Sequence, residues 1–287
     1  MGTLRKLASL VKLEHTVFAL PYAYAGMVLG ADQAGTDITV GLVVWITVAM
    51  VAARTLAMGL NRLIDASIDA RNPRTADREL VTGALVKPQV WALCAGSLVL
   101  LVLATLQLDA ITRVLWPIPV ALFVAYPYAK RFTWACHLLL GIAIGLAPLA
   151  AWLAAGGSGS DVVPYLVWLG VAAWIGGFDV IYALADIEFD RANGLYSIPA
   201  RFGIPRALTI VHVLHAGTVA LFAAAGAIAG LAAPFWIGLA IATALLAWEN
   251  SIVRPDDLTR IDKAFFTVNS YVGVALGGGL ILGSIFA

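Results

Sequence analysis

The sequence predicts an all-α protein that crosses a membrane several times, and three observations support this. Hydrophobic residues make up 61% of the 287 residues, while charged residues make up only 12%, about half the share typical of soluble domains. The mean hydropathy is +0.91. The apolar residues form runs of about 20, the length that an α-helix needs to cross the hydrocarbon core. A soluble domain of this size exposes too much surface to hide so much apolar area.

Taken in chain order, the apolar runs predict nine membrane-spanning helices, with boundaries good to a few residues. The first run follows basic residues, as a signal peptide does, but its spanning length and Pro21 favour a first span. No low-complexity linker or polar domain interrupts the series, so one membrane-embedded domain is expected over 1–287. The nine expected spans are 15–31, 38–60, 88–107, 111–129, 136–155, 164–186, 207–231, 233–249 and 264–286.

The basic residues predict the orientation. Of the 18 Lys and Arg residues, 16 fall in the N-terminal tail and in the connections that follow even-numbered spans. Only Arg113 falls on the opposite side, and Arg54 lies inside span two. The positive-inside rule therefore places the N-terminus and these connections in the cytoplasm. The net charge of +1 gives no indication of a nucleic-acid partner. The two cysteines, Cys94 and Cys136, lie in apolar stretches and are expected to be packing residues.

An acidic motif ends span two. Asn61, Asp65 and Asp69 are spaced by four residues, and residues so spaced share one face of a helix. Like charges at this spacing repel each other, and carboxylates beside hydrocarbon are costly. The pair is therefore expected to require a compensating cation.

A second acidic motif ends span six, where Asp179, Tyr182, Asp186 and Asp190 are expected to form one helical stripe. Aligning Asp186 with the first aspartate of the other motif matches the second pair as well, which suggests an internal duplication. The charge rule puts both motifs at cytoplasmic helix ends, so both are expected to face one cavity.

Carboxylates without His or Cys are typical ligands of a hard ion, and Mg²⁺ usually binds through a few carboxylates plus substrate phosphates. The two motifs therefore predict Mg²⁺ held by Asp65, Asp69, Asp186 and Asp190, where it would grip a diphosphate. The alternative is that these aspartates are solvated helix ends with no ligand.

The two motifs resemble the aspartate-rich motifs of the UbiA-type intramembrane aromatic prenyltransferases. The resemblance covers most of residues 10–206, and the last three spans match only in hydropathy. Within the family the chain is most similar to bacterial 4-hydroxybenzoate polyprenyltransferases, including a branch that makes menaquinone from a dihydroxynaphthoate. The other matching stretches are Lys12–His15, Asn72–Thr75, Arg78–Leu80, Tyr126–Thr133 and Gly194–Gly203.

This resemblance implies nine helices around a central cavity, Mg²⁺ as cofactor, and an enzyme that transfers a polyprenyl group. The donor would be a polyprenyl diphosphate and the acceptor an aromatic acid on the route to ubiquinone or menaquinone. It also implies a bacterial inner membrane, with the lipid bilayer around the spans and the active-site loops in the cytoplasm. Arg62 replaces an acidic residue of the family's first motif, which removes one carboxylate ligand and supplies a phosphate contact instead.

The same resemblance suggests roles for six other residues. Lys130 would neutralise the leaving diphosphate, as Arg and Lys clamps do, and Tyr126 and Tyr182 would face the allylic cation. Arg54 lies two turns before Asn61 and could bind the acceptor carboxylate bidentately. Arg131 is expected to contact substrate beside Lys130, and Asp179 to bind substrate. For Lys130 and Arg131 the alternative is a positive-inside anchor.

Two other functions stay open on the sequence alone. Intramembrane carboxylates and repeats also occur in secondary transporters, although transporter charges belong near mid-membrane rather than at helix ends. A prenyltransferase with another acceptor, such as haem or chlorophyllide, would have the same donor end.

Overall fold

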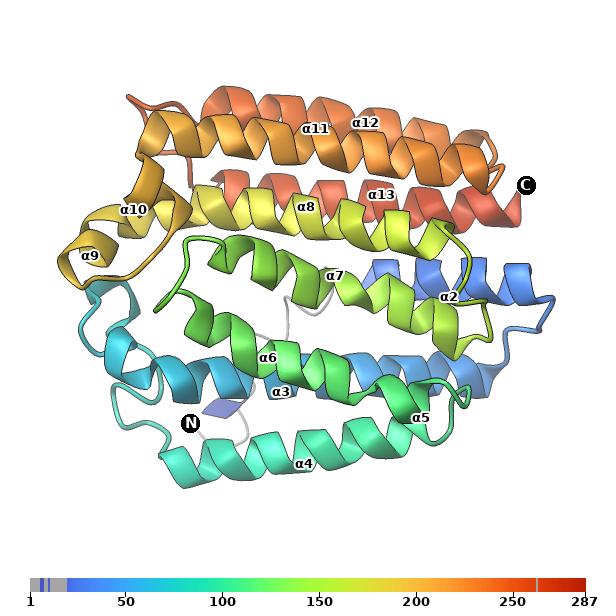
Figure 1. Ribbon diagram of the computed structural model, residues 1–287, viewed down its shortest axis with the longest axis horizontal. Helices are drawn as coiled ribbons and strands as arrows, with labels where there is room; N and C mark the ends of the chain where they lie inside the picture. The colour runs from blue at the N-terminus through green and yellow to red at the C-terminus, as the bar shows by residue number, and fades with distance from the viewer. Residues whose placement is uncertain (1–5, 8–9, 11–19, 262) are drawn as a thin grey trace. The chain divides into compact units, whose positions relative to one another are not determined.

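The computed structural model describes residues 6–7, 10, 20–261 and 263–287. Its regular secondary structure is helical throughout these residues, which confirms the all-α prediction (Figure 1). The stretch Lys12–His15, which contributed to the family resemblance, lies outside them. Backbone contacts divide the chain into two compact units, the first containing residues 39–128 and the second residues 18–38 and 129–287. The expectation of a single domain stays a prediction.

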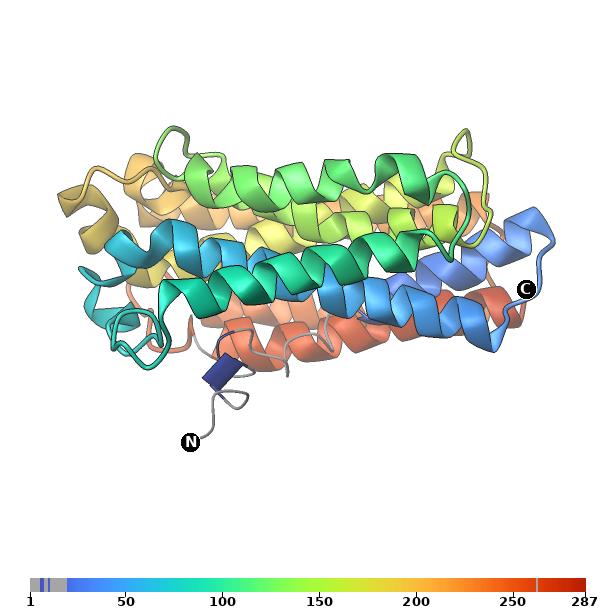
Figure 2. The ribbon, with the colours of Figure 1, turned by 90° about the horizontal axis from the view of Figure 1, so that it is seen from below.

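The first unit is built on a long helix, α3 (Val40–Asp69), which lies alongside α4 (Lys87–Thr105) in Figures 1 and 2. Thr39 caps the start of α3, because its hydroxyl accepts a hydrogen bond from the Leu42 amide at 3.1 Å. Cys94 is buried between the two helices, as expected of a packing residue. The other elements of this unit are η2 (Pro73–Thr75), α5 (Thr112–Leu115) and α6 (Pro117–Ala129).

The second unit closes a ring of six helices through neighbouring contacts. Going round the ring, α2 packs on α7, α7 on α8, α8 on α11, α11 on α12, α12 on α13, and α13 again on α2. These helices are α2 (Leu20–Ala34), α7 (Cys136–Ala154), α8 (Val163–Ala183), α11 (Ile204–Ile228), α12 (Ala233–Ile252) and α13 (Asn269–Ile285). Short elements complete the unit: η3 (Leu184–Asp186), α9 (Ile187–Ala192), α10 (Ile198–Phe202) and the π-helical turn η4 (Lys263–Val268).

Small residues allow two pairs of these helices to approach closely. A Cβ atom at Gly141 on α7 would lie 2.2 Å from the backbone oxygen of Ala172 on α8. A Cβ at Gly26 on α2 would lie 2.0 Å from the backbone oxygen of Pro148 on α7. Helices inside a bilayer associate through such close packing, because lipid tails are as apolar as the side chains themselves.

In the described part of the chain, seven helices are long and apolar enough to cross a membrane, so the prediction of a polytopic membrane protein is confirmed. The expected span at 15–31 begins outside the described residues, and α2 continues it. The expected span at 111–129 is divided at Trp116 into α5 and α6. The division falls where Pro117, which has no N–H to donate, begins a new helix. The count of nine stays a prediction.

Candidate active site

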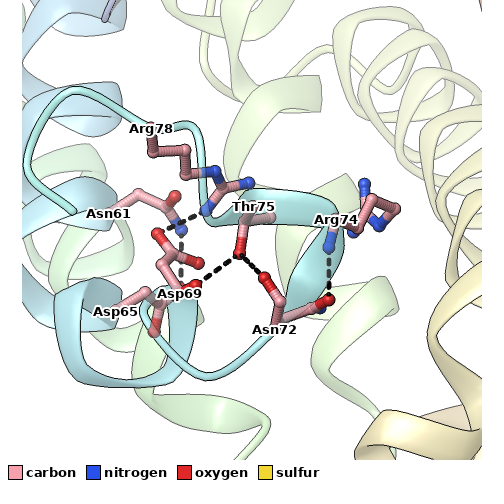
Figure 3. Close-up of polar contacts among 7 residues, drawn as sticks. All are labelled: Asn61, Asp65, Asp69, Asn72, Arg74, Thr75 and Arg78. Carbon is pink, nitrogen blue, oxygen red and sulfur yellow. Dashed lines mark hydrogen bonds and ion pairs between the residues drawn. The ribbon is translucent and has the colours of Figure 1, made fainter. Parts of the chain in front are cut away.

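The first acidic motif lies in the last turns of α3, within the first unit (Figure 3). The helix is unbroken from Val40 to Asp69, so Asn61, Asp65 and Asp69 follow one another along one face, as predicted. The Asn61 side-chain amide donates a hydrogen bond to Oδ2 of Asp65 at 3.3 Å. Both aspartates are buried, with relative exposures of 1% and 5%. Such burial separates them from ordinary solvated helix ends.

The connection after α3 holds Asp69 in place. The Arg78 guanidinium forms an ion pair with the Asp69 carboxylate at 2.5 Å, and the Thr75 hydroxyl donates to the Asp69 backbone oxygen at 3.0 Å (Figure 3). Asn72 starts the short helix η2 by accepting a hydrogen bond from the Arg74 amide at 3.0 Å. The sequence matched Arg78 to the family but did not identify it as the partner of Asp69. The nine-residue separation, across a turn, is not a helical spacing.

The other candidate residues of the first unit are Arg62, Arg54 and Tyr126, and they differ in burial and in position along the helices. Arg62 is 6% exposed and interacts electrostatically with the carboxylates of Asp69 and Glu79. Its Nε atom has no hydrogen-bond partner among the described residues. Arg54 lies on α3 two turns before the motif and is half-buried, as is Tyr126 on α6. The phosphate contact expected of Arg62 and the roles of Arg54 and Tyr126 stay predictions.

The second acidic motif lies in the second unit, on a helix that changes its geometry. The α-helix α8 ends at Ala183, the 3₁₀ turn η3 covers Leu184–Asp186, and α9 continues from Ile187. A 3₁₀ turn has three residues per turn rather than 3.6, so an α-helical stripe does not continue unchanged from Asp179 to Asp190. The expected stripe of four residues therefore crosses a 3₁₀ turn instead of following one α-helix. The two motifs also differ in local backbone structure, although their spacing in the sequence is equal.

The connection after α9 folds back onto Asp190 and onto Lys130. The Ser197 side chain forms a hydrogen bond with the Asp190 carboxylate, which also interacts electrostatically with Asp186 and Lys130. The Tyr196 amide donates to the Lys130 backbone oxygen at 2.7 Å. The structure thus brings Lys130, predicted as the cation for the leaving group, close to the second aspartate pair.

Asp179 has a partner that the sequence did not indicate. Nδ1 of His137, in the first turn of α7, lies 2.6 Å from Oδ2 of Asp179. A single histidine in an apolar run, 42 residues from its partner, carries no local signal for this contact. Tyr182 stacks edge-to-face on Phe266, with ring centroids 6.3 Å apart. Arg131 is half-buried beside the end of α6, and its substrate contact stays a prediction.

The carboxylates fit Mg²⁺ when a phosphate-bearing substrate completes the coordination. Among the described residues, no three His, Cys, Asp or Glu side chains converge into a protein-only metal cage. Each motif instead offers two aspartates, in keeping with Mg²⁺ sites that use one or two carboxylates, substrate phosphates and water. The Asp69 carboxylate already has one cationic partner, Arg78.

Comparison with known proteins identifies the family. The family model for UbiA prenyltransferases matches residues 19–271. The chain belongs to the UbiA prenyltransferase family. The matched range extends beyond residues 10–206, where motifs carried the resemblance, through spans seven and eight. The resemblance noted in the sequence is thereby confirmed, and so is the assignment as a prenyltransferase.

Individual UbiA proteins support this membership. The chain is 31% identical to a 4-hydroxybenzoate octaprenyltransferase of Thiobacillus denitrificans, over 84% of this chain and 82% of that protein. The structure of an apo UbiA homologue from Aeropyrum pernix is 34% identical, with a TM-score of 0.85 over 94% of this chain and 98% of the other. A UbiA homologue from Archaeoglobus fulgidus, bound to GPP and Mg²⁺, shares the fold at 21% identity. Its TM-score is 0.69, over 96% of this chain and 99% of that one.

Proposed function

We propose that this UbiA protein transfers a polyprenyl group from a polyprenyl diphosphate to an aromatic acid in quinone biosynthesis, with Mg²⁺ as cofactor. The acceptor is 4-hydroxybenzoate or a dihydroxynaphthoate. The observation that carries the proposal is the burial of Asp65 and Asp69 in a membrane-spanning helix. Ionisable side chains buried in such a helix are costly, and they usually mark a functional site. A relative named as a 4-hydroxybenzoate octaprenyltransferase supports the aromatic acceptor. A structural neighbour bound to GPP and Mg²⁺ supports the diphosphate donor and the metal.

In this proposal the two aspartate pairs, Asp65 with Asp69 and Asp186 with Asp190, are the Mg²⁺ ligands. Mg²⁺ held there would supply positive charge that stabilises the diphosphate as the bond between the diphosphate oxygen and the allylic carbon breaks. Lys130, whose charge acts on Asp190, stabilises the same developing negative charge.

Other residues bind the acceptor, stabilise the allylic cation and contact the diphosphate. Arg54 binds the carboxylate of the aromatic acid through its two-pronged guanidinium. The faces of Tyr126 and Tyr182 stabilise the allylic cation, and the membrane-embedded site excludes the water that would capture it. The electron-rich ring attacks the allylic carbon, forms the new C–C bond and loses a proton. Arg62 and Arg131 contact the diphosphate, and Asp179 contacts the acceptor.

The site is placed on the cytoplasmic side of a bacterial inner membrane. Polyprenyl diphosphates are charged and cannot cross hydrocarbon unaided, so the site must open where they are made. The distribution of basic residues supports the same side, because the connections that follow both motifs are rich in arginine.

The testing experiment is a transfer assay on the purified protein in lipid, with a polyprenyl diphosphate and Mg²⁺. In parallel reactions it offers three aromatic acids, namely 4-hydroxybenzoate, 1,4-dihydroxy-2-naphthoate and 1,4-dihydroxy-6-naphthoate, and separate reactions offer haem or chlorophyllide. We expect prenylation of one of the three, its abolition by EDTA and its restoration by Mg²⁺. Full activity in chelator would disprove the role of the metal, and prenylation of haem or chlorophyllide alone would disprove the acceptor.

Variants then test the ligands. Asp65→Asn and Asp186→Asn should each lose nearly all turnover while the protein still folds, because the amide is nearly isosteric with the carboxylate. Asp109→Asn is the matched control, since Asp109 lies in a connection, where its carboxylate caps the Ile111 amide at 3.0 Å. A near-normal rate in either variant would show that this aspartate is not needed for Mg²⁺-dependent transfer.

A further inference from the structure

The pair formed by His137 and Asp179 has the geometry of a fixed, charge-assisted contact. The distance of 2.6 Å between Nδ1 and Oδ2 is short for an N–H···O hydrogen bond, as expected when donor or acceptor is charged. The His137 side chain is only 6% exposed, whereas that of Asp179 is 24% exposed. The histidine is therefore enclosed by protein, and the carboxylate is the member of the pair that other molecules can reach.

The backbones on either side of this pair are held closely together. The Cβ of a residue at position 141, one turn after His137, would lie 2.2 Å from the Ala172 backbone oxygen. A Cβ at Gly176, just before Asp179, would lie 3.5 Å from the backbone oxygen of His137 itself. Because α7 and α8 approach so closely here, backbone packing sets the position of the imidazole relative to the carboxylate.

The imidazole has no way to act on a substrate directly. Its Nε2 atom is fully enclosed and has no hydrogen-bond partner in the described part of the chain. Any effect of His137 on the reaction must therefore pass through neighbouring side chains. It contacts Asp179 directly, and its interaction with Asp190 is electrostatic. By occupying Oδ2, the histidine selects one side-chain conformation of Asp179 and leaves Oδ1 for a second contact.

Asp179 lies seven residues before Asp186, across the end of α8 and the 3₁₀ turn η3. With a rise of about 1.5 Å per α-helical residue and about 2 Å per 3₁₀ residue, it lies about 10–12 Å deeper in the span. That depth places it beyond the aspartates assigned to the diphosphate, toward the apolar part of the helix where the acceptor ring would lie. We propose that His137 is a positioning residue that holds Asp179 so that Oδ1 accepts a hydrogen bond from the hydroxyl group of the aromatic acceptor. This rests on the proposed function for the identity of the substrate.

A purely structural role, in which His137 only ties α7 to α8, makes a different prediction. Loss of such a structural contact would lower the stability and weaken the binding of both substrates to the same extent. Loss of a positioning contact affects the acceptor selectively, because the diphosphate is bound by other residues. The discriminating quantity is therefore the ratio of the two KM values in a variant that still folds.

The experiment compares His137→Leu, which removes the hydrogen-bond donor, with His137→Gln, which keeps a side-chain donor. His215→Leu is the matched control. His215 is a second buried histidine of the same unit, 2% exposed, whose Nδ1 lies 3.0 Å from Oδ1 of the neutral Asn250. KM for acceptor and for polyprenyl diphosphate is measured for each variant on protein that elutes as a folded species.

We expect His137→Leu to raise the acceptor KM about tenfold or more, as for loss of a charge-assisted contact, with the diphosphate KM unchanged within a factor of two. His137→Gln should recover most of the loss, and His215→Leu should leave both KM values unchanged. In a double-mutant cycle on the acceptor KM, adding His137→Leu to Asp179→Asn should cost nothing further, because the positioning role of the histidine passes through that carboxylate. Equal rises in both KM values, or full additivity, would overturn the inference.

A second measurement separates this inference from the proposed function. In protein labelled with ¹⁵N-histidine, the signal that disappears in His137→Gln belongs to His137. Asp179→Asn should shift that signal and leave the His215 signal in place. An unchanged His137 signal overturns the pairing even if the enzyme transfers prenyl groups normally. If wild-type protein prenylates none of the acceptors, the proposed function fails and the acceptor-positioning role fails with it, whatever the spectrum shows.

Discussion

Asp69 is a buried carboxylate that the fold provides with cationic neighbours. It is 5% exposed, and its ion pair with Arg78 supplies the opposite charge at 2.5 Å. Arg62 adds a second cation within electrostatic range. Removing one partner of a buried pair leaves an uncompensated charge, which costs more than the pair itself contributes. The residues that hold Asp69 are therefore as important for the site as the aspartate.

Arg78→Ala should lower the free energy of unfolding by about 1–3 kcal/mol, since Arg78 is 23% exposed and water replaces part of its contact. Arg78→Lys should recover part of this, because it keeps the charge but loses the planar fork. The measurement is thermal unfolding in detergent. Arg71→Ala is the control, because Arg71 is exposed and its Nε donates to the Ser67 backbone oxygen at the end of the same helix. Equal unfolding temperatures for the two alanine variants would show that the ion pair contributes nothing.

At the scale of the helices, close packing requires a glycine where the backbone of a neighbouring helix approaches. Gly141 faces the backbone of α8, whereas a Cβ at Gly278 on α13 would meet nothing within 4 Å. Both are helical glycines, so the substitution to alanine has the same intrinsic effect on helix propensity. Any difference between them therefore reports the close approach of two helices.

Gly141→Ala should destabilise the protein by about 1–3 kcal/mol, because the added methyl forces α7 and α8 apart. Gly278→Ala should be neutral or slightly stabilising. Thermal unfolding in detergent, followed by helical circular dichroism, compares the two. If both variants unfold at the wild-type temperature, the contact between α7 and α8 is looser than the distances indicate.

Three helices of the second unit are joined by buried polar side chains. The Trp174 indole on α8 donates to Oδ1 of Asn269 on α13 at 2.6 Å, and the amide nitrogen of Asn269 donates to Glu249 on α12 at 2.7 Å. The same nitrogen lies 3.0 Å from the backbone oxygen of Ala264, in the π-helical turn before α13. Asn269 thus satisfies groups that would otherwise be unpaired in the protein interior.

Asn269→Leu should destabilise the fold strongly, because it leaves three buried polar groups without this partner, each at a cost of about 1–3 kcal/mol. Glu249→Gln is the matched variant and should fold normally, since it keeps the accepting oxygen and removes a carboxyl group from the interior. Yield of monodisperse protein and its unfolding temperature are compared. Normal yield and stability of Asn269→Leu would show that this network is dispensable.

At the scale of the whole chain, the proposed orientation places the connections at 70–87 and 191–206 in the cytoplasm. The argument is the concentration of basic residues on one set of connections. The structure identifies positions suited to labelling, because Ala76, Ala192 and Ser160 are exposed. Cys94 and Cys136 are the native cysteines and must first be replaced.

Cysteine introduced at Ala76 or Ala192 should react with a membrane-impermeant thiol reagent only in inside-out vesicles. Cysteine introduced at Ser160, between α7 and α8, should react only from the opposite side. Labelling is followed by the mass shift of the purified protein. Reaction of Ala192→Cys and Ser160→Cys from the same side would mean that α8 does not cross the bilayer, and the cytoplasmic site would be wrong.

The sequence by itself determined the membrane class and the helical fold. A chain segment inside hydrocarbon must satisfy its own backbone hydrogen bonds, so long apolar runs become helices whatever surrounds them. The acidic motif of Asn61, Asp65 and Asp69 was also readable, because its spacing is local and α3 is one unbroken helix. The departures were local too. Pro117 divides an expected span, and a 3₁₀ turn at Leu184–Asp186 interrupts the second motif.

Only the tertiary structure decided which side chains meet across the chain. His137 and Asp179 are 42 residues apart, and Trp174 and Asn269 are 95 apart. Neither pair follows a helical period. Their contacts depend on how closely helices pack, and that is set by glycines such as Gly141 and by backbone atoms they touch. A sequence records each of these residues separately, whereas the energy of a buried polar pair exists only once packing has excluded water from both partners.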